Sequence, residues 1–103
     1  MSESIVKLDL NNPVFQQTLF RLSKTEQNSV LGTLRKLSVM SWEQVYRDHG
    51  LKWELIYSKE GPDGERLYSF RLGQGFRAIA YRDSVWLRIL SLHPDHDSAY
   101  RSP

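Results

Sequence analysis

The chain has 103 residues, of which 40% are hydrophobic and 25% are charged, and its formal net charge is +2. This length and composition predict one folded domain over residues 1–103. The absence of cysteine excludes disulfides, thiolate zinc sites and cysteine nucleophiles. No stretch reaches the roughly 18–20 apolar residues of a membrane span, and the N-terminus lacks a signal-peptide pattern, so we expect a cytoplasmic protein.

The first residues predict a strand followed by a helix. The stretch IVKLDL (5–10) alternates apolar and polar residues, which indicates a short strand. Asn12 is a suitable N-cap, and Pro13 suits the first position of a helix. The helical spacing that follows is carried by Val14, Phe15, Thr18, Leu19 and Leu22.

Two further helices are predicted from capping signals. Ser23 with Glu26, and Ser41 with Gln44, each match the capping box that starts a helix. Gly50 is expected to end the last of these helices. The first two helices are expected to form an antiparallel hairpin. The apolar stripe of the second helix consists of Val30, Leu31, Leu34 and Leu37.

The second half of the chain predicts an antiparallel meander. From Leu51 the apolar residues recur with a period of two, and strands are expected over 66–72, 76–82 and 85–92, separated by turn residues. Helices are therefore confined to the first half. The predicted fold class is α+β, with the helix hairpin packed on a mainly antiparallel sheet of four to five strands.

The last third of the chain holds residues that suit metal-free cleavage of RNA. Arg71 and Arg77 lie on adjacent predicted strands, and His93, His96 and Tyr100 follow the last one. When a 2′-hydroxyl attacks the adjacent phosphorus, the reaction needs a base, an acid and cations on the phosphate oxygens. Histidine suits the first two roles and arginine the third, while an aromatic ring can stack on a base. No metal or other cofactor is required.

Three other interpretations of the segment HPDHD (93–97) stay open. Its imidazoles and carboxylates could hold a metal ion. A triad of Ser91, His93 and Asp95 is less suitable, because neighbouring residues of an extended segment point alternately. The segment could also be a polar tail, since proline, aspartate and serine favour turns. His49 is expected to be structural, because a positive charge suits a helix C-terminus.

The stretches YSFRLGQGFRAIAYRD (68–83) and VWLRILSLHPDHDSAY (85–100) resemble the RelE/ParE toxin superfamily. Many members have an arginine before a glycine-containing turn, an aromatic–arginine pair after it, and a hydrophobic strand that leads to a terminal tyrosine. Here these features match Arg71, Phe76 with Arg77, and Tyr100. The order of strand, helix hairpin and meander resembles the same superfamily.

The resemblance implies the toxin of a type II toxin–antitoxin pair, with a RelE-like ribonuclease fold. A RelE-like member would cut messenger RNA on the ribosome, inhibit translation and be neutralised by a cognate antitoxin. The implied catalytic residues are His96 or His93, Arg77 and Tyr100, and Arg71 and Arg77 would bind phosphate. Apart from the resemblance, Lys52 could assist phosphate binding if its strand lies near the site. His96 is preferred because it lies between two carboxylates and nearer Tyr100. The alternatives are a ParE-like inhibitor of DNA gyrase without enzymatic activity, or a degenerate toxin that only binds its antitoxin.

Overall fold

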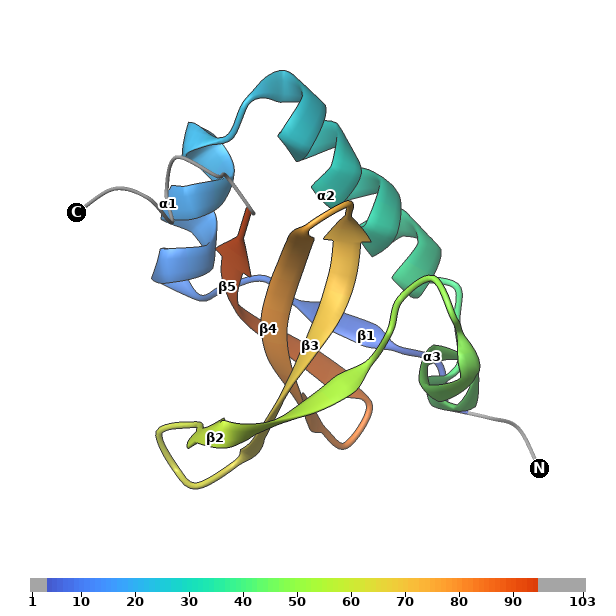
Figure 1. Cartoon of the computed structure of the whole chain (residues 1–103). Helices are drawn as coiled ribbons and strands as arrows, with labels where there is room; N and C mark the ends of the chain where they lie inside the picture. Colours follow the sequence, from blue (N-terminus) through green and yellow to red (C-terminus); the bar gives the residue numbers. More distant parts are fainter. Residues whose placement is uncertain (1–3, 95–103) are drawn as a thin grey trace.

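The computed structural model describes residues 4–94. They form an open five-stranded sheet in the order β1-β5-β4-β3-β2, with three helices (Figure 1). This arrangement confirms the predicted α+β class. The elements are β1 (Lys7–Asp9), α1 (Pro13–Arg21), α2 (Lys24–Leu37), α3 (Trp42–Arg47), β2 (Glu54–Glu60), β3 (Arg66–Gly73), β4 (Phe76–Asp83) and β5 (Trp86–His93).

All three helices begin where the capping signals predict. The Asn12 side chain accepts hydrogen bonds from the backbone N–H groups of the first turn of α1, and Pro13 is the first residue of that helix. Both capping boxes form, with Ser23 as the N-cap of α2 and Ser41 as the N-cap of α3. Each such cap contributes about 1 kcal/mol. These helix starts are therefore determined by local sequence.

The region after α3 differs from the prediction. The helix ends at Arg47 rather than continuing to Gly50, and β2 begins at Glu54 rather than near Leu51. The reason is Asp48, whose carboxylate accepts a hydrogen bond from the Leu51 backbone N–H at 2.8 Å. The same carboxylate pairs with Lys36 of α2 at 3.0 Å. These contacts hold the chain in a turn where the sequence predicts a regular strand.

The strands pair as a meander, with one exception at the edge. β2, β3, β4 and β5 pair in antiparallel order, whereas β1 pairs in parallel with β5 and is shorter than the predicted strand 5–10. α1 packs against β5, and α2 packs against β3 (Figure 1). None of the helices within residues 4–94 is long and apolar enough to cross a membrane.

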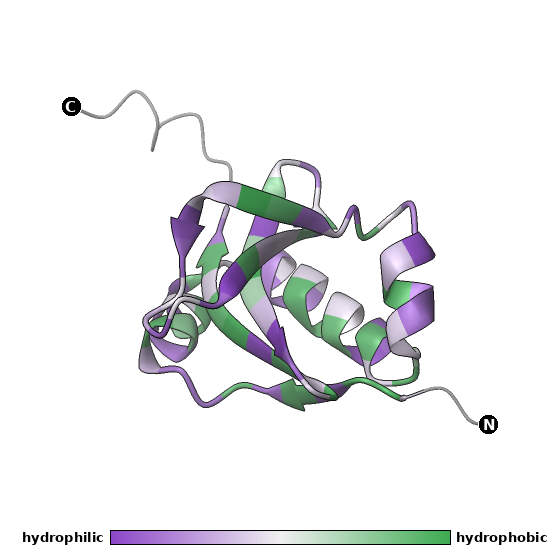
Figure 2. Ribbon diagram, turned by 90° about the horizontal axis from the view of Figure 1, so that it is seen from below, coloured by the Kyte–Doolittle hydropathy of each residue, from purple (hydrophilic) through white to green (hydrophobic). Residues whose placement is uncertain are grey.

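The two faces of the central strands differ in polarity. The face toward the helices supplies much of the hydrophobic core, including the fully buried Phe70, Ala78 and Ala80. Figure 2 shows hydrophobic and hydrophilic residues interspersed along the strands. Side chains alternate along a strand, so the intervening residues point to the opposite face. Helices leave this second face open, and we call it the open face. It carries the candidate site.

Candidate active site

Three predicted site residues lie in one row across the open face. The Cα partner of Arg71 in β3 is Arg77 in β4, and the Cα partner of Arg77 in β5 is His93. Residues that lie directly opposite one another on antiparallel strands point to the same side of the sheet. We call these three residues the cationic row. The charge of the row comes from its two arginines, and like charges placed directly opposite destabilise a sheet, so the facing Arg71 and Arg77 favour the binding of an anion.

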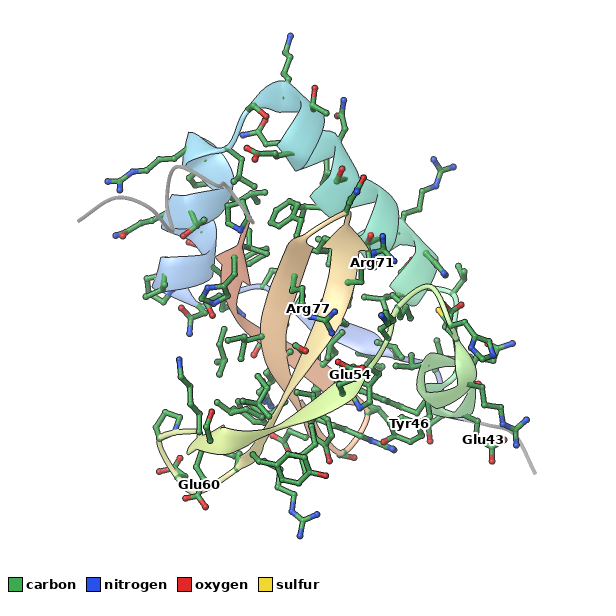
Figure 3. The ribbon with its side chains drawn as sticks, in the orientation of Figure 1. Glu43, Tyr46, Glu54, Glu60, Arg71 and Arg77 are labelled. Atoms are coloured by element: carbon green, nitrogen blue, oxygen red, sulfur yellow. The ribbon has the colours of Figure 1, made fainter. Side chains whose placement is uncertain are left out.

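Arg77 is the most firmly held member of the row. Its Nε and Nη2 donate hydrogen bonds to the Ser69 hydroxyl at 3.1 and 2.8 Å. Nη2 also donates to the Lys52 carbonyl at 2.9 Å and lies 3.5 Å from a Glu54 carboxylate oxygen (Figure 3). Within residues 4–94 these contacts use Nε and Nη2, which leaves Nη1 for a ligand. The side chain remains 32% exposed, so an anion can reach it.

Arg71 shares the face with Arg77 but leans the other way along β3. Its Nε donates to the carbonyl of Gly73 at 3.2 Å, toward the β3–β4 turn. Arg77 leans toward Ser69 instead, so the two guanidinium groups point to different parts of the open face (Figure 3). The structure thus places both arginines on one surface without directing them to a common point.

His93 is the last residue of β5, not a residue beyond the last strand as the sequence predicts. The strand is longer because His93 still pairs with Arg77 across the sheet. The Ser91 hydroxyl lies 2.8 Å from His93 Nε2. Burial lowers the pKa of the imidazole below its ordinary value, and the charge of Lys59 lowers the pKa further. The neutral ring is therefore favoured near pH 7, and a neutral imidazole can accept a proton.

Lys52 contacts the row through its backbone. Its φ of 49° lies in the left-handed region, and its carbonyl accepts the hydrogen bond from Arg77. A left-handed backbone costs a non-glycine residue roughly 1–2 kcal/mol. Such strained residues often lie at functional sites. The predicted role of its ammonium group in phosphate binding stays a prediction.

Three polar residues near the row were missed by the sequence analysis. Glu54 and Ser69 are Cα partners on neighbouring strands, and both contact Arg77. Ser91 contacts His93. The alternation of side chains along a strand could have identified two of them, because it places Ser69 on the same face as Arg71 and Ser91 on the same face as His93. The partnership of Glu54 with Ser69 depends on strand register and has no local signal.

Two other arginines of the second half, Arg82 and Arg88, have structural partners. Arg88 pairs with Asp9 of β1 and with Asp83, which ties the edge strand β1 to β5. Arg82 stacks on the ring of Trp42, with 4.5 Å between its guanidinium carbon and the ring centroid. These contacts account for Arg82 and Arg88 without a ligand.

Some predicted site residues lie outside the part of the chain that the structure describes. His96 and Tyr100 both belong to this group, as do the carboxylates of Asp95 and Asp97. Their predicted roles remain predictions. Within residues 4–94, no group of three or more histidine, aspartate or glutamate side chains is placed to hold a metal ion.

Comparison with known proteins gives one informative structural match. No protein-family model and no curated protein sequence matches the chain. The crystal structure of an archaeal RelE–RelB complex from Pyrococcus horikoshii OT3 contains a chain that matches with a TM-score of 0.57 and 25% sequence identity. The match covers 92% of this chain and 97% of the matched one. It confirms the predicted fold and supports the resemblance to the RelE-like toxin superfamily.

Proposed function

We propose that this chain, which has the fold of the RelE-like toxin superfamily, is an endoribonuclease that cuts messenger RNA on the ribosome. The structural match supports the coarser statement that it is the toxin of a type II toxin–antitoxin pair. The observation that carries the finer proposal is the cationic row, in which Arg71, Arg77 and His93 share one open face. Phosphate suits such a row, because its oxygens accept charge-assisted hydrogen bonds from guanidinium groups.

The proposed reaction uses acid–base chemistry without a metal. The 2′-oxygen attacks the adjacent phosphorus and gives its proton to a base, the P–O5′ bond breaks, and an acid protonates the departing 5′-oxygen. The products are a 2′,3′-cyclic phosphate and a free 5′-hydroxyl. Arg77 would stabilise the charge on the non-bridging oxygens, and Arg71 would hold a phosphate on the same face.

Two described groups could accept the proton. The neutral ring of His93 is one, because its lowered pKa favours the unprotonated form. The other is the Glu54 carboxylate, which lies beside Arg77. The sequence-based assignment of acid–base work to His96 and of base stacking to Tyr100 is retained in this proposal.

The partner we propose is a cognate antitoxin. The matched structure is a complex of RelE with RelB, and the same type of partnership is inferred for this chain. The proposed ribosomal target also places the protein in the cytoplasm. β2 is an edge strand of the sheet and could pair with an added strand of the antitoxin.

The test is induced expression followed by mapping of messenger RNA cuts and by measurement of methionine and thymidine incorporation. Wild-type protein should stop methionine incorporation first. Arg77→Ala should reduce cleavage on the order of 10²–10³-fold, as expected for a preorganised donor. Arg66→Ala, which removes a positive charge elsewhere on β3, is the matched control and should retain activity.

Further outcomes separate the alternatives. EDTA should leave cleavage unchanged, and a loss of cleavage in EDTA would favour metal chemistry. If thymidine incorporation stops first while translation continues, gyrase is the target. If neither stops although the protein still binds its antitoxin, the chain is a degenerate toxin.

A further inference from the structure

A cleft of about 480 Å³ lies between the end of α3 and the start of β2. Its volume falls within the range of about 300–1,000 Å³ that is typical of small-ligand sites. Aromatic and positively charged residues make up most of its lining. The lining residues are Tyr46, Arg47, Asp48, His49, Lys52, Trp53 and Glu54.

The cleft adjoins the cationic row. Lys52 and Glu54 line the cleft, and both also contact the Nη2 atom of Arg77, at 2.9 and 3.5 Å. These two residues therefore form a wall that the cleft and the row share. A polymer whose phosphate lies at Arg77 would have its neighbouring unit near the cleft.

The aromatic side of the cleft is held rigidly. The Trp53 ring stacks on Tyr68 with 4.8 Å between ring centroids and meets Trp42 edge-on at 5.5 Å. The Tyr46 hydroxyl accepts a hydrogen bond from Arg82 at 2.7 Å, yet half of the Tyr46 residue (50%) is exposed. Rings that are already ordered lose little conformational entropy when a flat ligand packs against them.

The charge in the cleft favours an anionic ligand. The Asp48 carboxylate is paired with Lys36, and the Glu54 carboxylate lies beside Arg77. Neither Lys36 nor Arg77 lines the cleft, so the negative charge of both lining carboxylates is balanced from outside it. Within residues 4–94 no carboxylate pairs with the Lys52 ammonium group. The Arg47 side chain is 81% exposed and has only a surface contact of 3.7 Å with a glutamate. Such surface pairs contribute little, so Arg47 can turn to a ligand.

We propose that this cleft binds the nucleotide next to the scissile phosphate in single-stranded RNA. The base would pack against Tyr46 and Trp53, and Lys52 and Arg47 would neutralise the phosphate. Single-stranded RNA is recognised by this combination of aromatic stacking and positive charge. The assignment rests on the proposed ribonuclease function and adds a second subsite to it.

The test measures the binding of a fluorescent 2′-O-methyl RNA hexamer, which lacks the attacking hydroxyl and cannot be cut. Tyr46→Ala should weaken binding on the order of 10-fold or more, because one stacked base is lost. Tyr46→Phe keeps the ring and loses only the hydroxyl contact with Arg82, so it should recover most of the binding that Tyr46→Ala loses. Tyr57→Ala removes an exposed tyrosine of β2 outside the cleft and should also have no effect.

Lys52→Gly tests the electrostatic part. Glycine accepts the left-handed φ of 49°, so the carbonyl contact with Arg77 is retained while the ammonium group is removed. A plot of log affinity against log salt concentration should become shallower by about 0.7 for one lost phosphate contact. Arg66→Ala is the control for the loss of a positive charge. Thermal unfolding of every variant checks that the fold is intact.

The outcomes distinguish the subsite from the function itself. If Arg77→Ala weakens RNA binding but Tyr46→Ala and Lys52→Gly do not, the subsite is refuted and the proposed function stands. If none of the three changes binding, the open face is not an RNA site and both fail. If the cleft variants weaken only the antitoxin complex, the cleft binds an acidic antitoxin segment and the RNA subsite is refuted.

Discussion

Ser69→Ala tests whether the rigidity of Arg77 matters for catalysis. The substitution removes the hydroxyl that accepts hydrogen bonds from both Nε and Nη2, at 3.1 and 2.8 Å. The remaining contacts, to the Lys52 carbonyl and to Glu54, both use Nη2. Without Ser69, the Arg77 guanidinium is therefore held only through Nη2 and can rotate about that atom. Its charge stays in the site, but its direction is no longer fixed.

The expected effects on stability and on activity differ in size. A hydrogen bond to a charged group contributes about 1.5–3 kcal/mol when buried. The Arg77 side chain is 32% exposed and water can replace the hydroxyl, so we expect the free energy of unfolding to fall by less than about 1.5 kcal/mol. Misplacement of a catalytic group by about 1 Å costs on the order of 10²-fold in rate. Cleavage should therefore decrease roughly 10- to 100-fold.

The assay is cleavage of a reporter messenger RNA in a cell-free translation reaction, with urea unfolding measured in parallel. Ser69→Thr retains the hydroxyl on a residue that suits a strand, so it should keep most of the activity. In a double-mutant cycle, Ser69→Ala should have no further effect once Arg77 is alanine. Full cleavage by the Ser69→Ala protein, or losses that simply add in the double mutant, would refute the positioning role.

Three further predictions concern pH and stability. If neutral His93 is the base, cleavage should rise with pH through the lowered pKa of His93, below 6.5, and His93→Gln should abolish that dependence in a pH–rate profile. Because the pKa of His93 is lowered by folding, the unfolded chain binds the His93 proton more readily than the folded chain does. The His93 contribution to stability should therefore be lost as the pH falls below about 6.5. In the His93→Gln protein, the free energy of unfolding in urea should vary less between pH 5 and pH 7. Ser23→Ala should lower the free energy of unfolding by about 1 kcal/mol through loss of the α2 capping box, with Ser58→Ala on exposed β2 as a silent control. A Ser23→Ala protein as stable as wild type in thermal unfolding would contradict the capping argument.

The local elements were predictable from the sequence because their signals lie within a few residues. Asn12, Ser23 and Ser41 each satisfy backbone N–H groups two or three residues ahead, so each helix start can be deduced without knowledge of the rest of the chain. The period of two likewise predicted the strands, and it places Arg71 on the face opposite to its buried neighbours Phe70 and Leu72. The end of α3 was not predictable, because Asp48 depends on Lys36 of another helix.

The cationic row was decided by the tertiary structure alone. Arg71, Arg77 and His93 come together because three strands pair in one particular register, and a slip of one residue would turn a whole strand over. Glu54 reaches Arg77 for the same reason, from a strand 23 residues earlier. Register follows from how the buried faces of all the strands fit one core. A local pattern therefore names the three residues of the cationic row, whereas only the packing of the whole domain places them side by side.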